Sequence, residues 1–191
     1  MNDSVELIHV GYHRCASTTL QHCLFSHHPQ IAWTKKSRLA YDSLIGMENV
    51  WFHSDAESRN QSRVISSEGL CGVDYTTSRL RPRWLEIPAM IHDKWPEARI
   101  LMIIRQQPKL IRSYYSLSII KQAITVRPKA YYDGIFQKQY LNYDQPISRY
   151  QKLFGASNVC VLLFEMLVRD QAAFMSRISE FSGVDLSCCS I

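Results

Sequence analysis

The chain has 191 residues, of which 46% are hydrophobic and 20% are charged, and this composition predicts one globular domain over residues 1–191. Its formal net charge of +5 is mildly basic and suits an anionic small ligand, but like charges never run long enough to indicate a nucleic-acid partner. The N-terminus does not have the pattern of a signal peptide, and no apolar stretch reaches the length of a membrane span. We therefore expect a soluble, cytoplasmic protein without stable membrane insertion.

The first half of the chain alternates between predicted strands and a helix. Apolar runs bounded by turn residues predict three strands: Val5–Gly11, Ile31–Trp33 and Arg63–Ser67. The helical spacing of Leu20, Cys23 and Leu24 predicts a helix over Ser17–Phe25, with Ser17 or Thr18 as its cap. Residues 34–62 form an irregular, polar segment.

The second half continues the alternation. Arg99–Ile104 and Val159–Phe164 are apolar enough to be strands covered on both faces of a parallel sheet. Four helices are predicted: Pro82–Trp95, Pro108–Ile120, Ile147–Phe154 and Asp170–Phe181. Residues 121–143 show no clear period. The order of elements predicts a single α/β domain, a three-layer sandwich around a mainly parallel sheet.

Six cysteines are scattered along the chain without a Cys-x-x-Cys pair: Cys15, Cys23, Cys71, Cys160, Cys188 and Cys189. In a chain of this size, such spacing predicts free thiols in a reducing compartment. We expect Cys23, Cys71 and Cys160 to be small core residues.

Polar residues follow three of the predicted strands. The loop after Gly11, the loop after Ser67 and the side chain of Arg105 all lie at carboxyl ends. Ligands of parallel α/β sheets bind at this edge, so we expect these three segments to meet at one site.

The loop after Gly11 has the chemistry of an anion site. A strand-to-helix loop directs backbone N–H groups and the positive end of a helix toward an anion. Arg14 adds a positive charge, and Ser17, Thr18 and Thr19 add hydroxyl donors. It is not a Walker A loop, because the Gly-Lys-Ser/Thr ending is absent. An ordinary helix start beside a surface arginine explains the pattern equally well.

A second motif follows the strongest strand. Arg105 ends this strand, and Ser113 lies eight residues further on. A guanidinium and a hydroxyl placed in this way can converge on one phosphate. Taken alone, a salt-bridged arginine and a surface serine would be the simpler interpretation.

Together the motifs resemble the sulfotransferase family that uses 3′-phosphoadenosine 5′-phosphosulfate, in a short, bacterial-type form. The family's first loop typically reads Pro-Lys-(Ser/Cys/Thr)-Gly-Thr-Thr, and here the run is His13-Arg14-Cys15-Ala16-Ser17-Thr18. The family's strand, arginine and serine motif matches Ile103-Ile104-Arg105 and Ser113. A third stretch, from Tyr150 to Val184, matches the end of the family's core. The likeness therefore covers the chain from about Glu6 to Val184.

The resemblance implies a P-loop-NTPase-like fold and a donor site. The 5′-phosphosulfate would lie in the loop of Arg14, Cys15, Ala16, Ser17, Thr18 and Thr19. Arg105 and Ser113 would hold the 3′-phosphate, and 3′,5′-adenosine bisphosphate would be the product. The resemblance implies no metal.

The chain departs from the family pattern in four places. His13 stands for the usual proline, Arg14 for the lysine that stabilises the leaving oxygen, and Ala16 for a glycine. The closing Arg-Lys-Gly segment of many members has no match. A relative that binds the nucleotide without transferring sulfate is therefore the alternative to an enzyme. A P-loop phosphotransferase is disfavoured, because the Walker lysine is absent and no strand end carries a clear Mg²⁺-binding acidic motif.

Sulfuryl transfer needs a base for the acceptor proton. Glu68 is the first candidate because it follows a strand predicted to end at the ligand edge, although it could instead pair with a cation and organise the loop. His53 is the second candidate, and His13, His27 and His28 are further alternatives. The acceptor, a small molecule or a glycan, would contact residues 34–62 or the tyrosine-rich residues 121–143.

Overall fold

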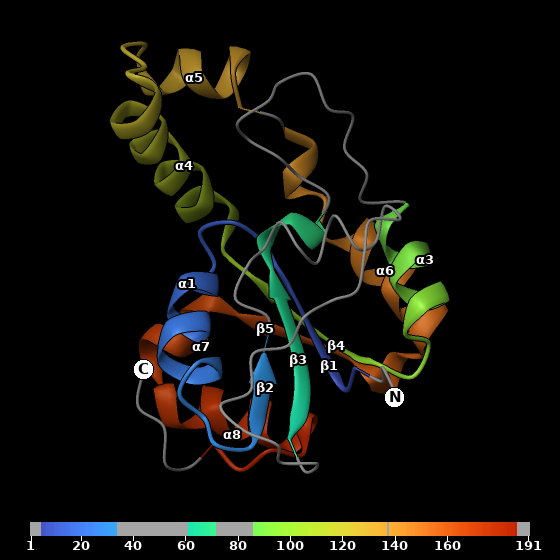
Figure 1. Ribbon diagram of the computed structural model, residues 1–191. Helices are drawn as coiled ribbons and strands as arrows, with labels where there is room; N and C mark the ends of the chain where they lie inside the picture. Colours follow the sequence, from blue (N-terminus) through green and yellow to red (C-terminus); the bar gives the residue numbers. More distant parts are fainter. Residues whose placement is uncertain (1–4, 34–60, 72–85, 137, 187–191) are drawn as a thin grey trace.

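A parallel five-stranded sheet forms the centre of the protein (Figure 1). The computed structural model describes residues 5–33, 61–71, 86–136 and 138–186. The strands are β1 (Leu7–Gly11), β2 (Ile31–Trp33), β3 (Ser62–Ser67), β4 (Arg99–Ile104) and β5 (Val159–Leu163), in the spatial order β2-β3-β1-β4-β5. The five predicted strands and the parallel sheet are confirmed. Phe164, predicted to end the last strand, instead begins a helix.

The middle of the sheet is its most buried part. Every residue of β1 is buried, and β4 is buried from Ile100 to Ile103. β1 pairs with β3 along one edge and with β4 along the other. Because successive side chains of a strand point to opposite faces, the burial of every residue of β1 means that both faces are covered. This burial on both faces explains why these strands read as continuous apolar runs rather than as alternating ones.

Helices cover both faces of the sheet and give it three layers (Figure 1). On one side lie α1 (Ser17–Thr19), the π-helix η1 (Leu20–Phe25), α7 (Phe164–Arg169) and α8 (Gln171–Ser182). On the other lie α3 (Ile87–Lys94) and α6 (Asp144–Phe154). Short 3-10 helices are η2 (Glu68–Cys71), η3 (Lys138–Leu141) and η4 (Ala156–Asn158). Residues 82–85, the start of the helix predicted over Pro82–Trp95, lie outside the described residues.

The first helix differs from its prediction in its winding and its cap. From Leu20 it is a π-helix, in which Ser26 N donates to Gln21 O, five residues back. Residues five apart then share a face, so Leu20 and Phe25 are buried while Cys23 is exposed. The prediction of Cys23 as a core residue is wrong. No side-chain cap bond forms at Ser17 or Thr18, because Ala16 holds the cap position.

Helices also replace the segment without a clear period. α4 (Gln107–Gln122) ends at Ala123 in the left-handed region, and α5 (Pro128–Gly134) follows it. Tyr131 packs against Tyr115 at 5.3 Å between ring centroids, and Tyr132 stacks on Phe136 at 6.1 Å. The contact between Tyr115 and Tyr131 joins residues of two helices, which a periodicity along one segment does not reveal. α4 and α5 rise from the carboxyl edge of the sheet (Figure 1), and we call residues 105–138 the arm.

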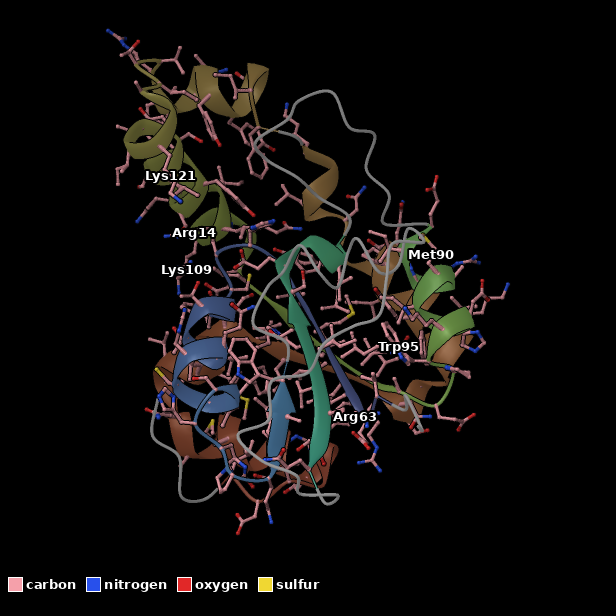
Figure 2. The ribbon with its side chains drawn as sticks, viewed as in Figure 1. Arg14, Arg63, Met90, Trp95, Lys109 and Lys121 are labelled. Carbon is pink, nitrogen blue, oxygen red and sulfur yellow. The ribbon has the colours of Figure 1, made fainter. Side chains whose placement is uncertain are left out.

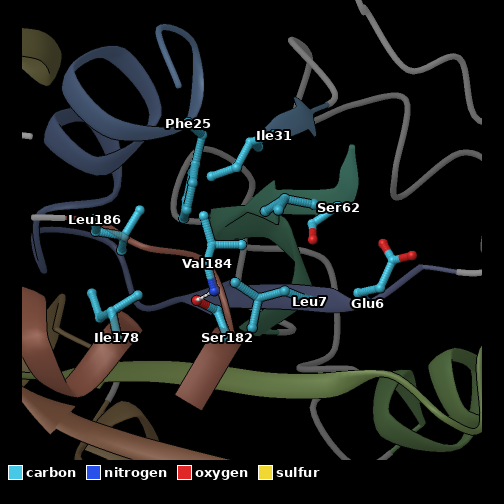
Figure 3. Close-up of a pocket in the computed structure, with 10 residues that line it drawn as sticks. Glu6, Leu7, Phe25, Ile31, Ser62, Ile178, Ser182, Val184 and Leu186 are labelled. Atoms are coloured by element: carbon cyan, nitrogen blue, oxygen red, sulfur yellow. Dashed lines mark hydrogen bonds between the residues drawn. The ribbon is translucent and has the colours of Figure 1, made fainter. Parts of the chain in front are cut away.

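A small apolar pocket lies between the sheet and α8, away from the strand ends that carry the predicted motifs. In Figure 3, Phe25, Ile178, Val184 and Leu186 point toward one another around it. Glu6 and Ser62 stand at its border, at the amino ends of β1 and β3. Its lining is that of a packing defect rather than of a polar ligand site. Within the described residues, no helix combines the length and apolarity that crossing a membrane requires.

Candidate functional site

The three predicted strand-end segments lie at the same edge of the sheet. Val10 pairs with Ser67, and Gly11 pairs with Ile103, so β1, β3 and β4 finish level with one another. The loop after β1, the 3-10 helix η2 and Arg105 therefore adjoin. The prediction of one common face is confirmed.

The loop after β1 has a strained backbone. Arg14 and Ala16 both have φ near 66°, in the left-handed region that side chains disfavour. Gly11, at the start of this loop, packs closely against Ser17. A Cβ at position 11 would lie 2.3 Å from Ser17 Oγ. Such a conformation persists only where surrounding contacts hold it.

Those contacts come from β4 and α4. The Tyr114 hydroxyl donates to His13 O at 3.2 Å, and Arg105 Nη1 donates to Arg14 O at 2.9 Å. In return, Arg14 Nε donates to Ser113 Oγ at 2.9 Å. The two motifs that the sequence analysis treated separately are thus joined directly, with two guanidinium groups and one hydroxyl together.

The loop residues differ in what they can offer a ligand. Cys15 is fully buried and its thiol donates to His13 O at 3.6 Å, so only its backbone can reach a ligand. Ser17 is also buried, beneath the loop. Arg14 and Thr18 are exposed, while Ala16 and Thr19 are half-buried. Arg14, Thr18 and the loop backbone therefore form the accessible surface.

Three side chains contact Arg105 or the residue after it, and the sequence analysis did not assign them to this motif. Its guanidinium lies over the Phe164 ring, 4.4 Å from the centroid. The Tyr143 hydroxyl donates to Arg105 O at 2.9 Å, and burial raises the pKa of this phenol. Glu165 accepts from the next backbone N–H, Gln106 N, at 3.2 Å. The only available signal was that Phe164 and Glu165 also follow a strand.

The Arg105 guanidinium has one further donor to offer. Its Nε is buried and, among the residues that the structure describes, makes no hydrogen bond. Burying a charged donor of this kind costs free energy of folding unless an acceptor forms a hydrogen bond with it. An anionic ligand beside Arg105 and Ser113 would supply that acceptor.

Glu68 pairs with His13 across the site. Glu68 Oε2 lies 2.9 Å from His13 Nδ1. Burial by itself would raise the pKa of Glu68, but the hydrogen bond and charge of His13, assisted by Ser17, hold it below its usual value of 4.5. Glu68 is therefore a carboxylate at neutral pH. The side chain that Glu68 contacts in this pair is the imidazole of His13.

A second histidine lies beneath this pair. His9 is fully buried in β1, and its Nδ1 lies 2.8 Å from Ser66 Oγ. Gln21 Nε2 donates to the same hydroxyl at 3.1 Å, so Ser66 joins the two side chains. Burial lowers the pKa of His9 to about 4, against a smaller opposing effect of Glu68.

The remaining predicted bases do not join this group within the described chain. His28 is buried and its Nε2 donates to Asp185 O at 2.9 Å, which fixes it beyond the end of the first helix. His27 is exposed and bonds within the same turn, to Ser26 and His22 O. His53 and nearly all of the predicted acceptor segment 34–62 lie outside the described residues. Of the other predicted acceptor segment, Tyr131 is buried within the arm.

Comparison with protein families gives one match. The model described as "Sulfotransferase family" matches residues 74–187, which is more than half of the chain. The matched segment includes Arg105 and Ser113, whereas the loop after β1 and Glu68 precede it. Among curated proteins no sequence match was found.

Solved structures share the fold over nearly the whole chain. A sulfotransferase from Alicyclobacillus acidocaldarius superposes with a TM-score of 0.70 at 17% identity, covering 95% of this chain and 81% of its own. Mouse sulfotransferase SULT7A1, complexed with PAP, gives 0.59 at 14% identity, covering 97% of this chain and 60% of the mouse chain. The sulfotransferase domain of the curacin biosynthetic pathway gives 0.59 at 11% identity, covering 95% of this chain and 75% of that domain.

Proposed function

Since this chain belongs to the sulfotransferase family, we propose that it moves a sulfuryl group from 3′-phosphoadenosine 5′-phosphosulfate to a hydroxyl or amine of an acceptor. The observation that carries the proposal is the meeting of Arg14, Arg105 and Ser113 at the carboxyl edge of the sheet. Two guanidinium groups and a hydroxyl from three segments form a site for a ligand with more than one anionic group.

The proposed donor site divides between the loop and α4. The backbone of residues 14–19, with the accessible Thr18, would surround the phosphosulfate at the start of the first helix. Arg105 and Ser113 would bind the 3′-phosphate, with the buried Arg105 Nε completing its hydrogen bonds there. In support of a nucleotide ligand, mouse sulfotransferase SULT7A1 was solved in complex with PAP.

In the proposed reaction, the acceptor oxygen or nitrogen attacks sulfur while the bond from sulfur to the bridging oxygen breaks. The acceptor proton passes to Glu68, which the low pKa keeps ionised and ready to accept it. Arg14 offers positive charge to the departing phosphate, in the role of the family's lysine. Because Glu68 Oε2 contacts His13 Nδ1, the proton can reach the carboxylate directly or the imidazole that Glu68 orients.

The acceptor in this proposal is a small molecule or a glycan. Tyr143, whose hydroxyl bonds to Arg105 O, is the tyrosine of the predicted acceptor segment with a direct link to the donor motif. We further propose a cytoplasmic location, supported by the free thiols of Cys15, Cys23 and Cys160 among the described cysteines.

The first experiment measures nucleotide binding by calorimetry, because it requires no acceptor. The protein is titrated with 3′,5′-adenosine bisphosphate without Mg²⁺ and, separately, with adenosine triphosphate and Mg²⁺. Binding of the bisphosphate alone supports the donor site. Preference for the triphosphate with Mg²⁺ would replace the proposal with phosphoryl transfer, and absence of bisphosphate binding would remove it.

The second experiment separates an enzyme from a binding module. An acceptor screen with radiolabelled donor detects transfer to phenols and sugars. A protein that binds the bisphosphate but transfers to no acceptor, and does not hydrolyse the donor, would fit the alternative of a nucleotide-binding relative. Arg14 and Ala16, which replace the family's lysine and glycine, would then be the first positions to revert.

A further inference from the structure

The charge of this protein is concentrated in the arm. Residues 105–138 contain seven cationic residues and a single carboxylate, Asp133, and therefore carry a net charge of +6. The whole chain carries +5, so all remaining residues together carry −1. The seven cations are Arg105, Lys109, Arg112, Lys121, Arg127, Lys129 and Lys138.

The arm also presents aliphatic side chains to solvent. Of the six large hydrophobic side chains that are exposed among the described residues, four belong to it: Ile119, Ile120, Val126 and Ile135. Ile120 is 80% exposed and precedes Lys121, and Val126 is 37% exposed and precedes Arg127. Both pairs flank the turn between α4 and α5, where the arm lies away from the sheet (Figure 1).

These aliphatic side chains are not needed to fill the interior of the arm. The interior of the arm is already filled by aromatic contacts among Tyr114, Tyr115, Tyr131 and Phe136. Ser118 Oγ and Tyr131 OH, 3.1 Å apart, satisfy each other there. The exposed isoleucines and valine therefore lie outside a complete internal packing unit.

We propose that the turn between α4 and α5 is a docking surface for an anionic lipid bilayer. A bilayer interface takes both kinds of side chain at once, since aliphatic groups enter the acyl boundary while lysine and arginine remain at the anionic headgroups. A soluble acidic polymer would satisfy the cations but leave the aliphatic side chains in water. The arrangement holds the protein on the surface without a spanning segment.

Two features of the arm set the strength expected. Lys129 and Lys138 are partly neutralised by Asp133, at 2.5 Å and 3.9 Å from its carboxylate oxygens. Lys121 and Arg127 are exposed and adjoin the aliphatic residues, so they carry the electrostatic part of binding. Figure 2 shows Lys121 on the arm, beyond Arg14 of the donor loop. Each such cation contributes about a fivefold gain in partition onto an anionic surface at low salt.

The test is flotation of the full chain with vesicles of phosphatidylcholine alone and with about one third phosphatidylglycerol. Binding is expected only to the anionic vesicles and should fall as salt is raised. The double variant Val126→Ser with Arg127→Gln should lose at least about tenfold in partition. The matched control is Val168→Ser with Arg169→Gln, an exposed Val-Arg pair on α7 outside the arm, which should bind as wild type does.

Three outcomes would overturn the proposal: no wild-type binding to anionic vesicles, equal losses in the two double variants, or an effect of Arg127→Gln with none of Val126→Ser. The last, together with tight binding to soluble polyglutamate, would indicate an acidic polymer instead. Thermal unfolding of each variant controls for the fold. Because lipid binding is measured without nucleotide, its failure is independent of the donor-site proposal.

Discussion

Arg14 Nε donates a hydrogen bond of 2.9 Å to Ser113 Oγ, although 99 positions separate the two residues. The bond ties a strained loop to the first turns of α4. It also means that the loop and the proposed 3′-phosphate site are one structural unit, so that changes in either should be felt in both.

Replacing Arg105 by Ala should weaken binding of 3′,5′-adenosine bisphosphate by about 10- to 100-fold, because a charged donor pair to the phosphate is lost. It also removes the bond from Nη1 to Arg14 O, which holds the loop. Calorimetry measures the affinity. Arg177→Ala is the control, since this exposed arginine pairs with Glu180 on α8. Equal affinities in both variants would refute the assignment.

Ser113→Ala should cost less, about fivefold in bisphosphate affinity, because one uncharged hydroxyl is removed. The same titration applies, and Ser116→Ala provides a control on the same helix. The Ser116 hydroxyl donates to Arg112 O within α4. A loss at Ser116 as large as at Ser113 would mean that α4 had simply been destabilised.

Glu68→Gln should leave bisphosphate affinity nearly unchanged and reduce turnover by about 10²- to 10⁴-fold, as expected for loss of a general base. His13→Gln tests whether the imidazole takes the proton. A loss of turnover in His13→Gln as large as that in Glu68→Gln would indicate that the imidazole takes the proton. Full turnover in Glu68→Gln would contradict both proposed roles of Glu68, as the base and as the residue that orients His13.

Gly11→Ala should destabilise the fold by about 1–3 kcal/mol, because the new Cβ would lie 2.3 Å from Ser17 Oγ. Adding Ser17→Ala removes that oxygen and should recover part of the loss. In Gly134→Ala the new Cβ meets nothing within 4 Å, so this variant should be neutral or slightly stabilising. Thermal unfolding compares the three, and equal melting temperatures for Gly11→Ala and wild type would contradict the packing.

Stability should depend on pH through His9. Its pKa is about 4 in the folded chain and 6.5 ordinarily, so the unfolded chain binds the additional proton between these values. The free energy of unfolding should therefore be highest above pH 6.5 and decrease by up to about 3 kcal/mol as the pH falls to 4. Glu68, with its lowered pKa, contributes only at more acidic pH, below its usual 4.5.

Urea unfolding at several pH values measures this slope. His9→Gln should flatten it, and His22→Gln, at an exposed position, should not. If the slope survives in His9→Gln, then the buried imidazole is not its source.

Local patterns in the sequence predicted the strands well. Continuous apolar runs such as residues 99–104 are a direct consequence of burial on both faces, and parallel strands bring their ends to one edge. Gly11, Glu68 and Arg105 could thus be assigned to a common face before any coordinates, because strand direction and strand ends are properties of a short segment.

Partners across the site required the tertiary structure. The contacts of Glu68 with His13, of Arg14 with Ser113 and of Phe164 with Arg105 join residues 55 or more positions apart, and no local period encodes them. The π-helical winding that exposes Cys23 and the helix α5 were likewise visible only in the structure. The sequence by itself determined which groups reach the carboxyl edge, through local burial and alternation. Only the fold decided which of them touch, because those contacts depend on how separate segments pack.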